Sequence, residues 1–156
     1  MHEVEAKGIL INNGGFTGMN IYRGCTHGCK YCDSRSACYQ FTHPFTDIEV
    51  KKNALSDPYM HCEEELGLTR ACLEIIKKYE FGLAIQTKSD RILRDIDLLA
   101  EINNRSKCVV QLTITTIDED LCKIVEPNVC TTKRRFEVIR HYWDEANPCQ
   151  IYVMGL

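Results

Sequence analysis

The sequence lacks an excess of positive charge. It has 19 Lys and Arg against 22 Asp and Glu, a net charge of -3, which argues against the broad basic surface typical of nucleic-acid-binding proteins. It also lacks an apolar run near the ~20 residues of a membrane span. The opening MHEVEAKGIL has neither the basic nor the apolar region of a secretory signal. We therefore expect a cytoplasmic protein with no membrane partner. The net charge does not support a nucleic-acid partner.

Repeats and low-complexity segments are absent as well. The 156 residues, 44% apolar and 26% charged, suffice for one globular domain with its own core. Ten cysteines are many for such a chain. Because no export signal is present, we expect a reducing compartment, where clustered cysteines are metal ligands more often than disulfides. Scattered cysteines are then small buried side chains.

The hydrophobic pattern alternates between strand and helix signals. Strands are predicted at 19–25, 81–89, 107–116 and 149–156, and helices at 64–79, 90–102, 118–126 and 131–146. Asp90 is the expected N-cap of the second helix. The residues expected to face the core are Leu68, Ala71, Cys72, Ile75, Ile76 and Tyr79 on the first helix, Ile92, Ile96, Leu99 and Ile102 on the second, and Phe136, Ile139, Trp143 and Ala146 on the last. This alternation predicts an α/β fold with a parallel sheet.

Sites in parallel sheets form at the carboxyl ends of the strands. The polar segments at those ends are 23–32, 86–89 and 113–116. We expect these three segments to meet at one edge of the sheet.

The segment CTHGCKYC places Cys25, Cys29 and Cys32 within eight residues. A structural zinc site needs four ligands, and the sequence has no second C-x-x-C pair. The fourth zinc ligand would have to be His27, Cys38 or His43. The alternative is a 4Fe–4S cluster held by three thiolates, with its fourth iron open to a substrate or cofactor.

Several segments resemble one protein family. The spacing C-x-x-x-C-x-aromatic-C, with Tyr31 before the last cysteine, is similar to the motif of the radical S-adenosylmethionine (SAM) superfamily. Between Met19 and Ile139 the matching segments resemble the spore-photoproduct-lyase-like (SPL) branch of that superfamily. They read NIYRGCTHGCKYCDSR, VKKNAL, SDPY, LTRACLEI, TKSDRILRDIDLL and VEPN.

The resemblance implies a radical SAM enzyme of a lyase-like type. Cys25, Cys29 and Cys32 would hold a 4Fe–4S cluster whose open iron chelates SAM. Reductive cleavage would give a 5′-deoxyadenosyl radical that abstracts hydrogen from an unknown substrate, with the hard chemistry belonging to the cofactors. An electron donor of the flavodoxin or ferredoxin type is the expected partner.

Six further residues are implied as SAM contacts, each with a simpler alternative. Tyr31 would lie near the adenine, or only pack the loop. Lys88 would reach the SAM carboxylate, or only end a strand in solvent. Ser56 and Asp57 would contact the amino group, or only form a turn. Thr113 and Thr115 would line the ribose side, or only favour a strand. Cys62 is a weaker candidate, as a thiol hydrogen donor, and Arg35 is either a surface charge or a substrate contact.

The chain departs from the family in extent. A full (β/α)8 barrel needs ~250 residues, so we expect a partial, incomplete TIM-like radical SAM barrel with parallel strands over 19–156, after an N-terminal extension at 1–18. By comparison with the family, we expect that a helix and a strand are missing between Leu55 and Ser56 and that the carboxyl end is shortened. Two other functions stay open: a non-catalytic zinc- or iron–sulfur-binding remnant, and DNA repair of the spore photoproduct lyase type.

Overall fold

The computed structural model describes residues 1–4, 10–13, 16–19, 21–36, 41–51, 57–144 and 150–155. The strands are β1 (His2–Val4), β2 (Leu10–Asn13), β3 (Phe16–Met19), β4 (Tyr22–Arg23), β5 (Glu49–Lys51), β6 (Leu83–Thr87), β7 (Cys108–Ile114) and β8 (Gln150–Gly155). The α-helices are α1 (Glu63–Leu66), α2 (Leu68–Lys78), α3 (Ile96–Arg105), α4 (Glu119–Val125) and α5 (Thr132–Asp144), and the 3-10 helices are η1 (Asp33–Arg35) and η3 (Asp90–Asp95).

One three-stranded sheet has the order β6-β7-β8, with both pairs of strands parallel. Cys108, Val110 and Leu112 lie on one face of β7 and are fully buried, because α2, α3 and α5 contribute to the same core. The alternate residues Val109 and Gln111 are only half-buried. The period-2 pattern of β7 therefore directs one face of the strand to the helices.

A second sheet has the order β1-β5-β4, with β1 parallel and β4 antiparallel to β5, and β2 and β3 form a separate antiparallel pair. A smaller core lies under the second sheet, centred on Tyr22, Ile48 and Met60. The Tyr22 hydroxyl donates a hydrogen bond to the buried carboxylate of Glu63 in α1. This contact joins the strand that precedes the cysteines to the helical layer.

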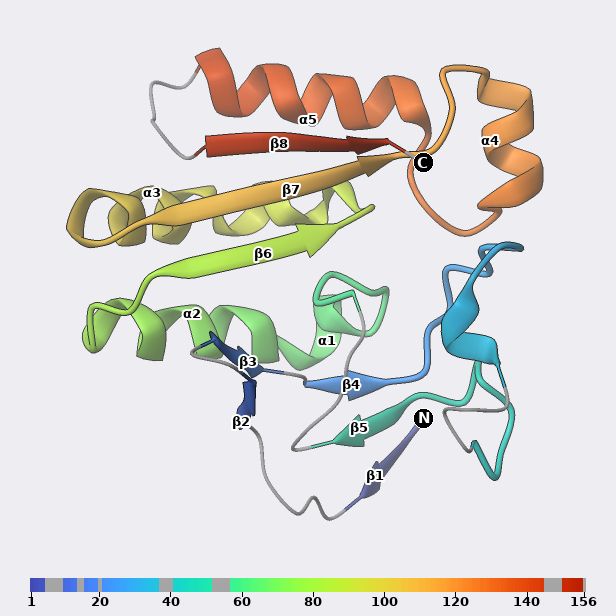
Figure 1. Ribbon diagram of the computed structural model, residues 1–156, viewed down its shortest axis with the longest axis horizontal. Coiled ribbons are helices and arrows are strands. Elements are labelled where there is room, and N and C mark those ends of the chain that lie inside the picture. Colours follow the sequence, from blue (N-terminus) through green and yellow to red (C-terminus); the bar gives the residue numbers. More distant parts are fainter. Residues whose placement is uncertain are drawn as a thin grey trace.

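The predicted partial barrel with parallel strands is wrong, although the α/β class holds. A barrel requires one continuous sheet that closes on itself. Among the residues that the structure describes, the strands instead form three separate sheets, one entirely antiparallel and one mixed. Figure 1 shows β6, β7 and β8 side by side with β4 and β5 apart from them, and no closed ring of strands.

Most predicted elements between 63 and 144 are present with different boundaries. The first predicted helix is broken at Gly67, whose left-handed backbone (φ +60°) ends α1 and starts α2. The second begins as a 3-10 turn capped by Ser89, whose side chain accepts a hydrogen bond from the backbone of Arg91, so the predicted Asp90 cap is wrong. The predicted gap at 55/56 lies outside the described residues.

Two of the three predicted core faces are displaced around their helices. On α2 the buried side chains are Thr69 and Leu73, whereas Ile75 and Tyr79 are 57% and 60% exposed. On the second helical segment the expected residues Ile92, Leu99 and Ile102 are buried, as predicted.

On α5 the predicted face was partly wrong, since Ile139 packs against the core as predicted but other members do not. Val138 and Tyr142 are buried there, while Phe136 and Trp143 are 47% and 77% exposed. The predicted face lies one position along the helix from the buried one, a turn of about 100°.

No helix in the described part of the chain is long and apolar enough to cross a membrane.

Candidate functional site

The cysteine loop, residues 24–32, leaves β4 at the edge of the molecule where the arrowheads of β6, β7 and β8 end (Figure 1). Gly24 starts the loop with φ +93°, and a Cβ there would lie 2.6 Å from the carbonyl oxygen of Phe45. Gly28 has φ +72° and leaves only 3.0 Å between such a Cβ and the side-chain nitrogen of Asn128. Both positions therefore require glycine, for backbone conformation and for space.

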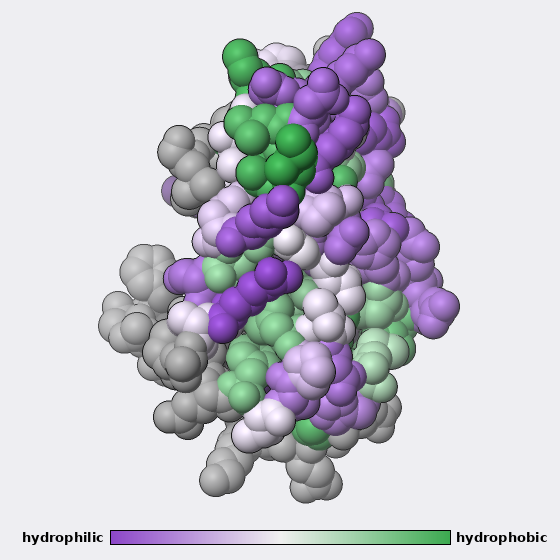
Figure 2. Space-filling model, turned by 90° about the vertical axis from the view of Figure 1, so that its right-hand side faces the viewer, coloured by the Kyte–Doolittle hydropathy of each residue, from purple (hydrophilic) through white to green (hydrophobic). Residues whose placement is uncertain are grey.

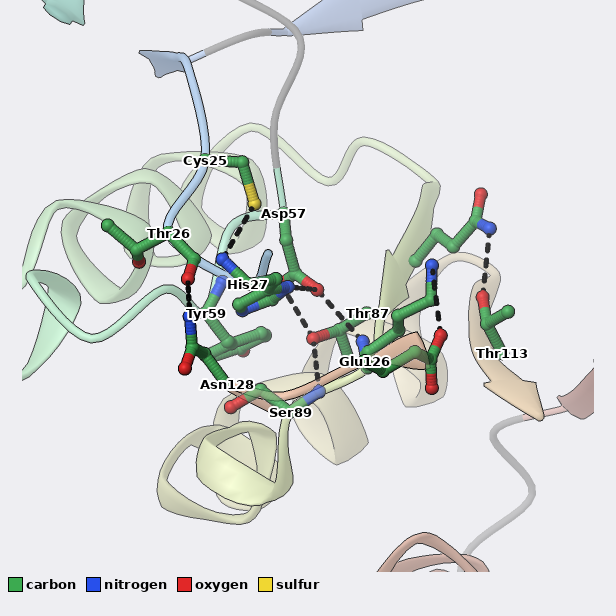
Figure 3. Close-up of polar contacts among 12 residues, drawn as sticks. Cys25, Thr26, His27, Asp57, Tyr59, Thr87, Ser89, Thr113, Glu126 and Asn128 are labelled. Carbon is green, nitrogen blue, oxygen red and sulfur yellow. Dashed lines mark hydrogen bonds and ion pairs between the residues drawn. The ribbon is translucent and has the colours of Figure 1, made fainter. Parts of the chain in front are cut away.

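The cysteine loop is bound to the loop that follows α4, through three hydrogen bonds. The backbone N–H of Lys30 donates to the carbonyl of Val125 at 2.8 Å, and that of Asn128 donates to the carbonyl of His27 at 3.2 Å. The side-chain amide of Asn128 donates to the carbonyl of Thr26 at 2.7 Å (Figure 3). The motif VEPN thus holds a loop almost 100 residues earlier in the sequence.

The three cysteines are reduced thiols with different environments. None of the eight cysteines in the described residues forms a disulfide. Cys29 is buried, and Cys25 and Cys32 are half-buried. Burial raises the pKa of Cys25 to about 12, against a lowering from the backbone N–H of His27, which donates to the sulfur at 3.4 Å. Burial also raises the pKa of Cys29, which the Lys88 ammonium partly offsets. Metal binding at these thiols must therefore release protons.

The positions of the three sulfurs do not match a single zinc ion. Thiolates on one tetrahedral zinc, with Zn–S of about 2.3 Å, lie about 3.8 Å apart. Within the described part of the chain, three ligand atoms all lie within 4.8 Å of one another at His2, His43 and Glu49, and not at the three cysteines.

The proposed fourth zinc ligands lie elsewhere or are engaged. His27 faces Asp57, with Nδ1 and Oδ2 3.6 Å apart, and His43 pairs with Glu49. Cys38 lies outside the described residues.

Glu126 is the polar centre of this edge. Its carboxylate accepts a hydrogen bond from the Tyr31 hydroxyl, and Oε1 accepts one from Thr115 at 2.7 Å. The Lys88 ammonium lies 3.8 Å from Oε1 and 5.4 Å from the centre of the Tyr31 ring. Oε2 accepts a hydrogen bond from Arg135 at 2.7 Å. One buried carboxylate therefore joins the cysteine loop, the ends of β6 and β7, and α5.

Arg135 is the other half of this buried ion pair. It is fully buried, and it donates to the carbonyls of Cys130 and Thr113 at 3.0 and 2.9 Å as well as to Glu126. Burial works to raise the pKa of the Glu126 carboxyl, but hydrogen bonds from Tyr31, Thr115 and Arg135 outweigh it and hold that pKa below its usual value. Glu126 is therefore ionised at neutral pH.

Asp57 organises the other side of the site (Figure 3). Oδ1 accepts from the backbone of Tyr59 at 2.9 Å and the hydroxyl of Thr87 at 2.7 Å. Oδ2 accepts from the backbone of Lys88 at 2.8 Å and faces His27. Burial, the largest influence, lowers the pKa of His27 despite the neighbouring carboxylate. Asp57 thus connects the SDPY segment, the end of β6 and the cysteine loop.

The remaining predicted contacts lie around this network. The Thr113 hydroxyl accepts a hydrogen bond from the side chain of Gln86 at 3.2 Å. Cys62 packs against the small core below β4. The Arg35 guanidinium lies 5.8 Å from the centre of the Phe45 ring. Ser56 lies outside the described residues.

The three segments expected at the strand ends do meet. Tyr31 contacts Thr115, with 2.8 Å between the two hydroxyl oxygens, and the Lys88 ammonium lies beside both Tyr31 and Glu126. The sequence analysis gave no role to Glu126, Arg135 or Asn128. The VEPN segment was noted as a resemblance, and its position after the predicted helix 118–126 was the available signal.

A hollow and an apolar patch lie on the surface around the site. A hollow of about 630 Å³ beside the cysteine loop is lined by Thr26, His61, Asp90, Arg91, Pro127, Asn128, Val129 and Cys130. Figure 2 views this edge of the molecule and shows a hydrophobic patch toward its top, where α4 lies. Ile117, Leu121 and Ile124 are the exposed apolar side chains there.

Comparisons with known proteins find relatives whose names state no function. The chain is 31% identical to uncharacterized protein MJ0683 of Methanocaldococcus jannaschii over 147 residues, 82% of this chain and 55% of that protein. It is 25% identical to uncharacterized protein Rv2578c of Mycobacterium tuberculosis over 162 residues, 86% of this chain and 48% of that protein. It is 26% identical to uncharacterized protein ORF301 of Acidianus two-tailed virus over 153 residues, 78% and 50% of the two chains.

The chain thus spans about half the length of the curated relatives it matches. No protein-family model matches the sequence, and no solved structure matches it.

Proposed function

We propose that this chain is part of a radical SAM protein of the SPL-like type. In this proposal Cys25, Cys29 and Cys32 bind a 4Fe–4S cluster, and its open iron binds SAM. The observation that supports it best is the placement of the three thiols. They lie on one glycine-hinged loop, at the carboxyl edge of the parallel strands, beside the Lys88–Glu126–Arg135 network.

The donor set fits such a cluster. Three thiols without disulfides, Cys25, Cys29 and Cys32, are present within eight residues, and three thiolates are the number that leaves one iron of a 4Fe–4S cluster open. The backbone N–H of His27 already donates to the Cys25 sulfur, a type of contact that stabilises thiolates and tunes cluster potentials. When bound, the cluster and SAM would supply reductive cleavage of SAM and a radical able to abstract hydrogen.

The chain's own residues hold the cysteine loop in place and keep the Lys88 ammonium beside it. Glu126 fixes Tyr31 beside the cysteines through the hydrogen bond from its hydroxyl. Lys88 keeps an ammonium next to Cys29, where it favours the thiolate and can pair with the carboxylate of SAM. Only 20% of the Lys88 side chain is exposed, so such a pair would be weakly screened by water.

Asp57 orients the backbone of Lys88 and the ring of His27. A direct contact between Asp57 and the amino group of SAM remains part of the proposal, as do Ser56 and the ribose contacts of Thr113 and Thr115. An electron donor of the flavodoxin or ferredoxin type would be the redox partner. The substrate class is not assigned.

Anaerobic reconstitution tests the proposal. The chain is reconstituted with iron and sulfide, then incubated with dithionite and SAM, and 5′-deoxyadenosine is measured by chromatography. We expect 5′-deoxyadenosine from the wild-type chain and none from Cys25→Ala, Cys29→Ala or Cys32→Ala, because each variant lacks one ligand.

Cys72→Ala is the matched control. Cys72 lies half-buried on α2, away from the loop, so its loss should leave SAM cleavage unchanged. Cleavage by Cys29→Ala at the wild-type rate would overturn the proposal, as would a colourless chain that takes up one zinc and no iron.

A further inference from the structure

A second group of metal-binding side chains lies away from the cysteines, at the amino ends of β1 and β5. His2 in β1 pairs in register with Glu49 in β5, and His43 precedes β5 by six residues. One ligand atom from each of these three residues lies within 4.8 Å of the other two. Two imidazoles and one carboxylate from three separate segments therefore converge at one point.

His43 and Glu49 are in direct contact. His43 Nε2 lies 2.6 Å from Oε1 of Glu49, and its Nδ1 lies 3.1 Å from the carbonyl oxygen of Pro44. A separation of 2.6 Å is that of a hydrogen bond between the two side chains. A metal ion that bound both atoms would replace this hydrogen bond.

Two features beyond the pair favour a metal site. The His2 ring lies 5.1 Å from that of His43, centre to centre, at an angle of 81°, so a second imidazole is close to the pair. The rings also have the outer contacts that metal-binding histidines normally have. His43 uses the Pro44 carbonyl, and Nδ1 of His2 lies 3.2 Å from Oδ2 of Asp47.

We propose that His2, His43 and Glu49 bind a divalent transition-metal ion of the zinc class. Imidazole with carboxylate suits zinc, cobalt, nickel and copper, whereas magnesium and calcium prefer oxygen ligands alone. The His2 and Asp47 side chains are 42% and 38% exposed, whereas that of Glu49 is 8% exposed. The site is thus open on one side, where water can complete the coordination.

Two positive groups of the protein lie near the proposed metal site and are expected to limit its affinity for a divalent ion. Arg23 Nη1 lies 3.5 Å from Oε1 of Glu49, and the amino group of Met1 lies 2.8 Å from Oδ1 of Asp47. Both are positive, so a bound cation would share these carboxylates with them. Binding of a divalent ion here is therefore expected to weaken as salt or proton concentration rises.

The proposed site contains none of the three loop cysteines, so it is tested in a variant that lacks them. The full 156-residue chain carrying Cys25→Ala, Cys29→Ala and Cys32→Ala is stripped with chelator and titrated with Co²⁺, alongside the chain with its cysteines intact. We expect the triple variant to bind one Co²⁺ with visible d–d bands and no thiolate-to-cobalt charge-transfer band, and the chain with its cysteines intact to bind this ion as well.

Ligand variants identify the site. On the triple-variant background, His43→Gln and Glu49→Gln should weaken Co²⁺ binding at least tenfold, while His141→Gln on α5 should leave it unchanged. His2→Gln keeps the His43–Glu49 contact and changes only an exposed residue. It therefore tests the site even if the other two variants unfold, and it should remove the rise in melting temperature that Co²⁺ gives the parent. Unchanged affinity in a folded His2→Gln chain would overturn the proposal, as would Co²⁺ binding that disappears with the cysteines.

Discussion

At the scale of single residues, Glu126 determines how the candidate site is held together. Its buried carboxylate accepts hydrogen bonds from Tyr31, Thr115 and Arg135 and lies beside Lys88. Arg135 is equally buried. Burying two charges is unfavourable unless they are paired and their other polar atoms are satisfied, and here the hydroxyls and backbone carbonyls complete that requirement.

We predict that Glu126→Gln lowers the free energy of unfolding by about 3 kcal/mol, because it leaves a buried guanidinium without its counter-charge. Urea denaturation measures this change. The control is Lys123→Gln, which removes an exposed pair with Asp120 at 3.4 Å and should change stability by less than about 0.5 kcal/mol. Equal effects of the two variants would show that the Glu126–Arg135 pair is not essential.

The same variant has a pH signature. The folded-state pKa of Glu126 lies below its usual value, so ionised Glu126 stabilises the fold above the unfolded pKa of about 4.3. That stabilisation is lost as pH falls through the folded pKa. We therefore expect the stability difference between wild type and Glu126→Gln to be largest near pH 7 and to shrink below about pH 4. A difference that stayed constant down to pH 3 would contradict the assignment.

At the scale of elements, the sequence predicted where helices and strands lie better than which faces they bury. The strand over β7 was recognisable from its β-branched residues, and the core residues of the second helix were correct. On α5 the apolar residues Phe136 and Trp143 suggested a core face, but the helix instead buries Arg135 against Glu126. Hydrophobic periodicity treats arginine as exposed, so it could not find an interface defined by an ion pair.

The orientation of α5 gives a prediction of its own. Val138→Ala should lower stability by about 2 kcal/mol, since it removes two buried methyl groups and leaves a cavity. Trp143→Ala removes a far larger side chain, but one that is 77% exposed, and should change stability by less than about 0.5 kcal/mol. Thermal or urea unfolding of both variants checks the order. A larger loss for Trp143→Ala would place α5 in the rotation predicted from the sequence.

At the scale of the whole molecule, the expected barrel was wrong while the meeting of the strand ends was right. Local patterns indicated a parallel sheet, and β6-β7-β8 is one. They could not reveal that β4 would pair antiparallel with β5, because that pairing joins residues 22–23 to residues 49–50 and the stretch 44–55 has no clear period. Strand pairing is set by long-range packing rather than by local pattern.

The candidate site depends less on the complete architecture than on two loops and one sheet edge. The cysteine loop is bound to the VEPN loop by Lys30, Asn128 and the network around Glu126. The cysteine spacing suggested a metal site, which stays a prediction, and the strand pattern placed Lys88 and Thr115 at strand ends. It could not predict Arg135, since nothing in the local sequence shows which distant carboxylate an arginine will meet.

Iron and acid-labile sulfide content is the measurement that tests the central proposal most directly. After anaerobic reconstitution and removal of unbound iron, we predict about four irons and four sulfides per wild-type chain, with a brown colour. Under the same treatment Cys29→Ala should retain far less, and Cys72→Ala should match the wild type. Equal iron and sulfide in the wild type and Cys29→Ala would contradict the assignment of the cysteine loop as a cluster site.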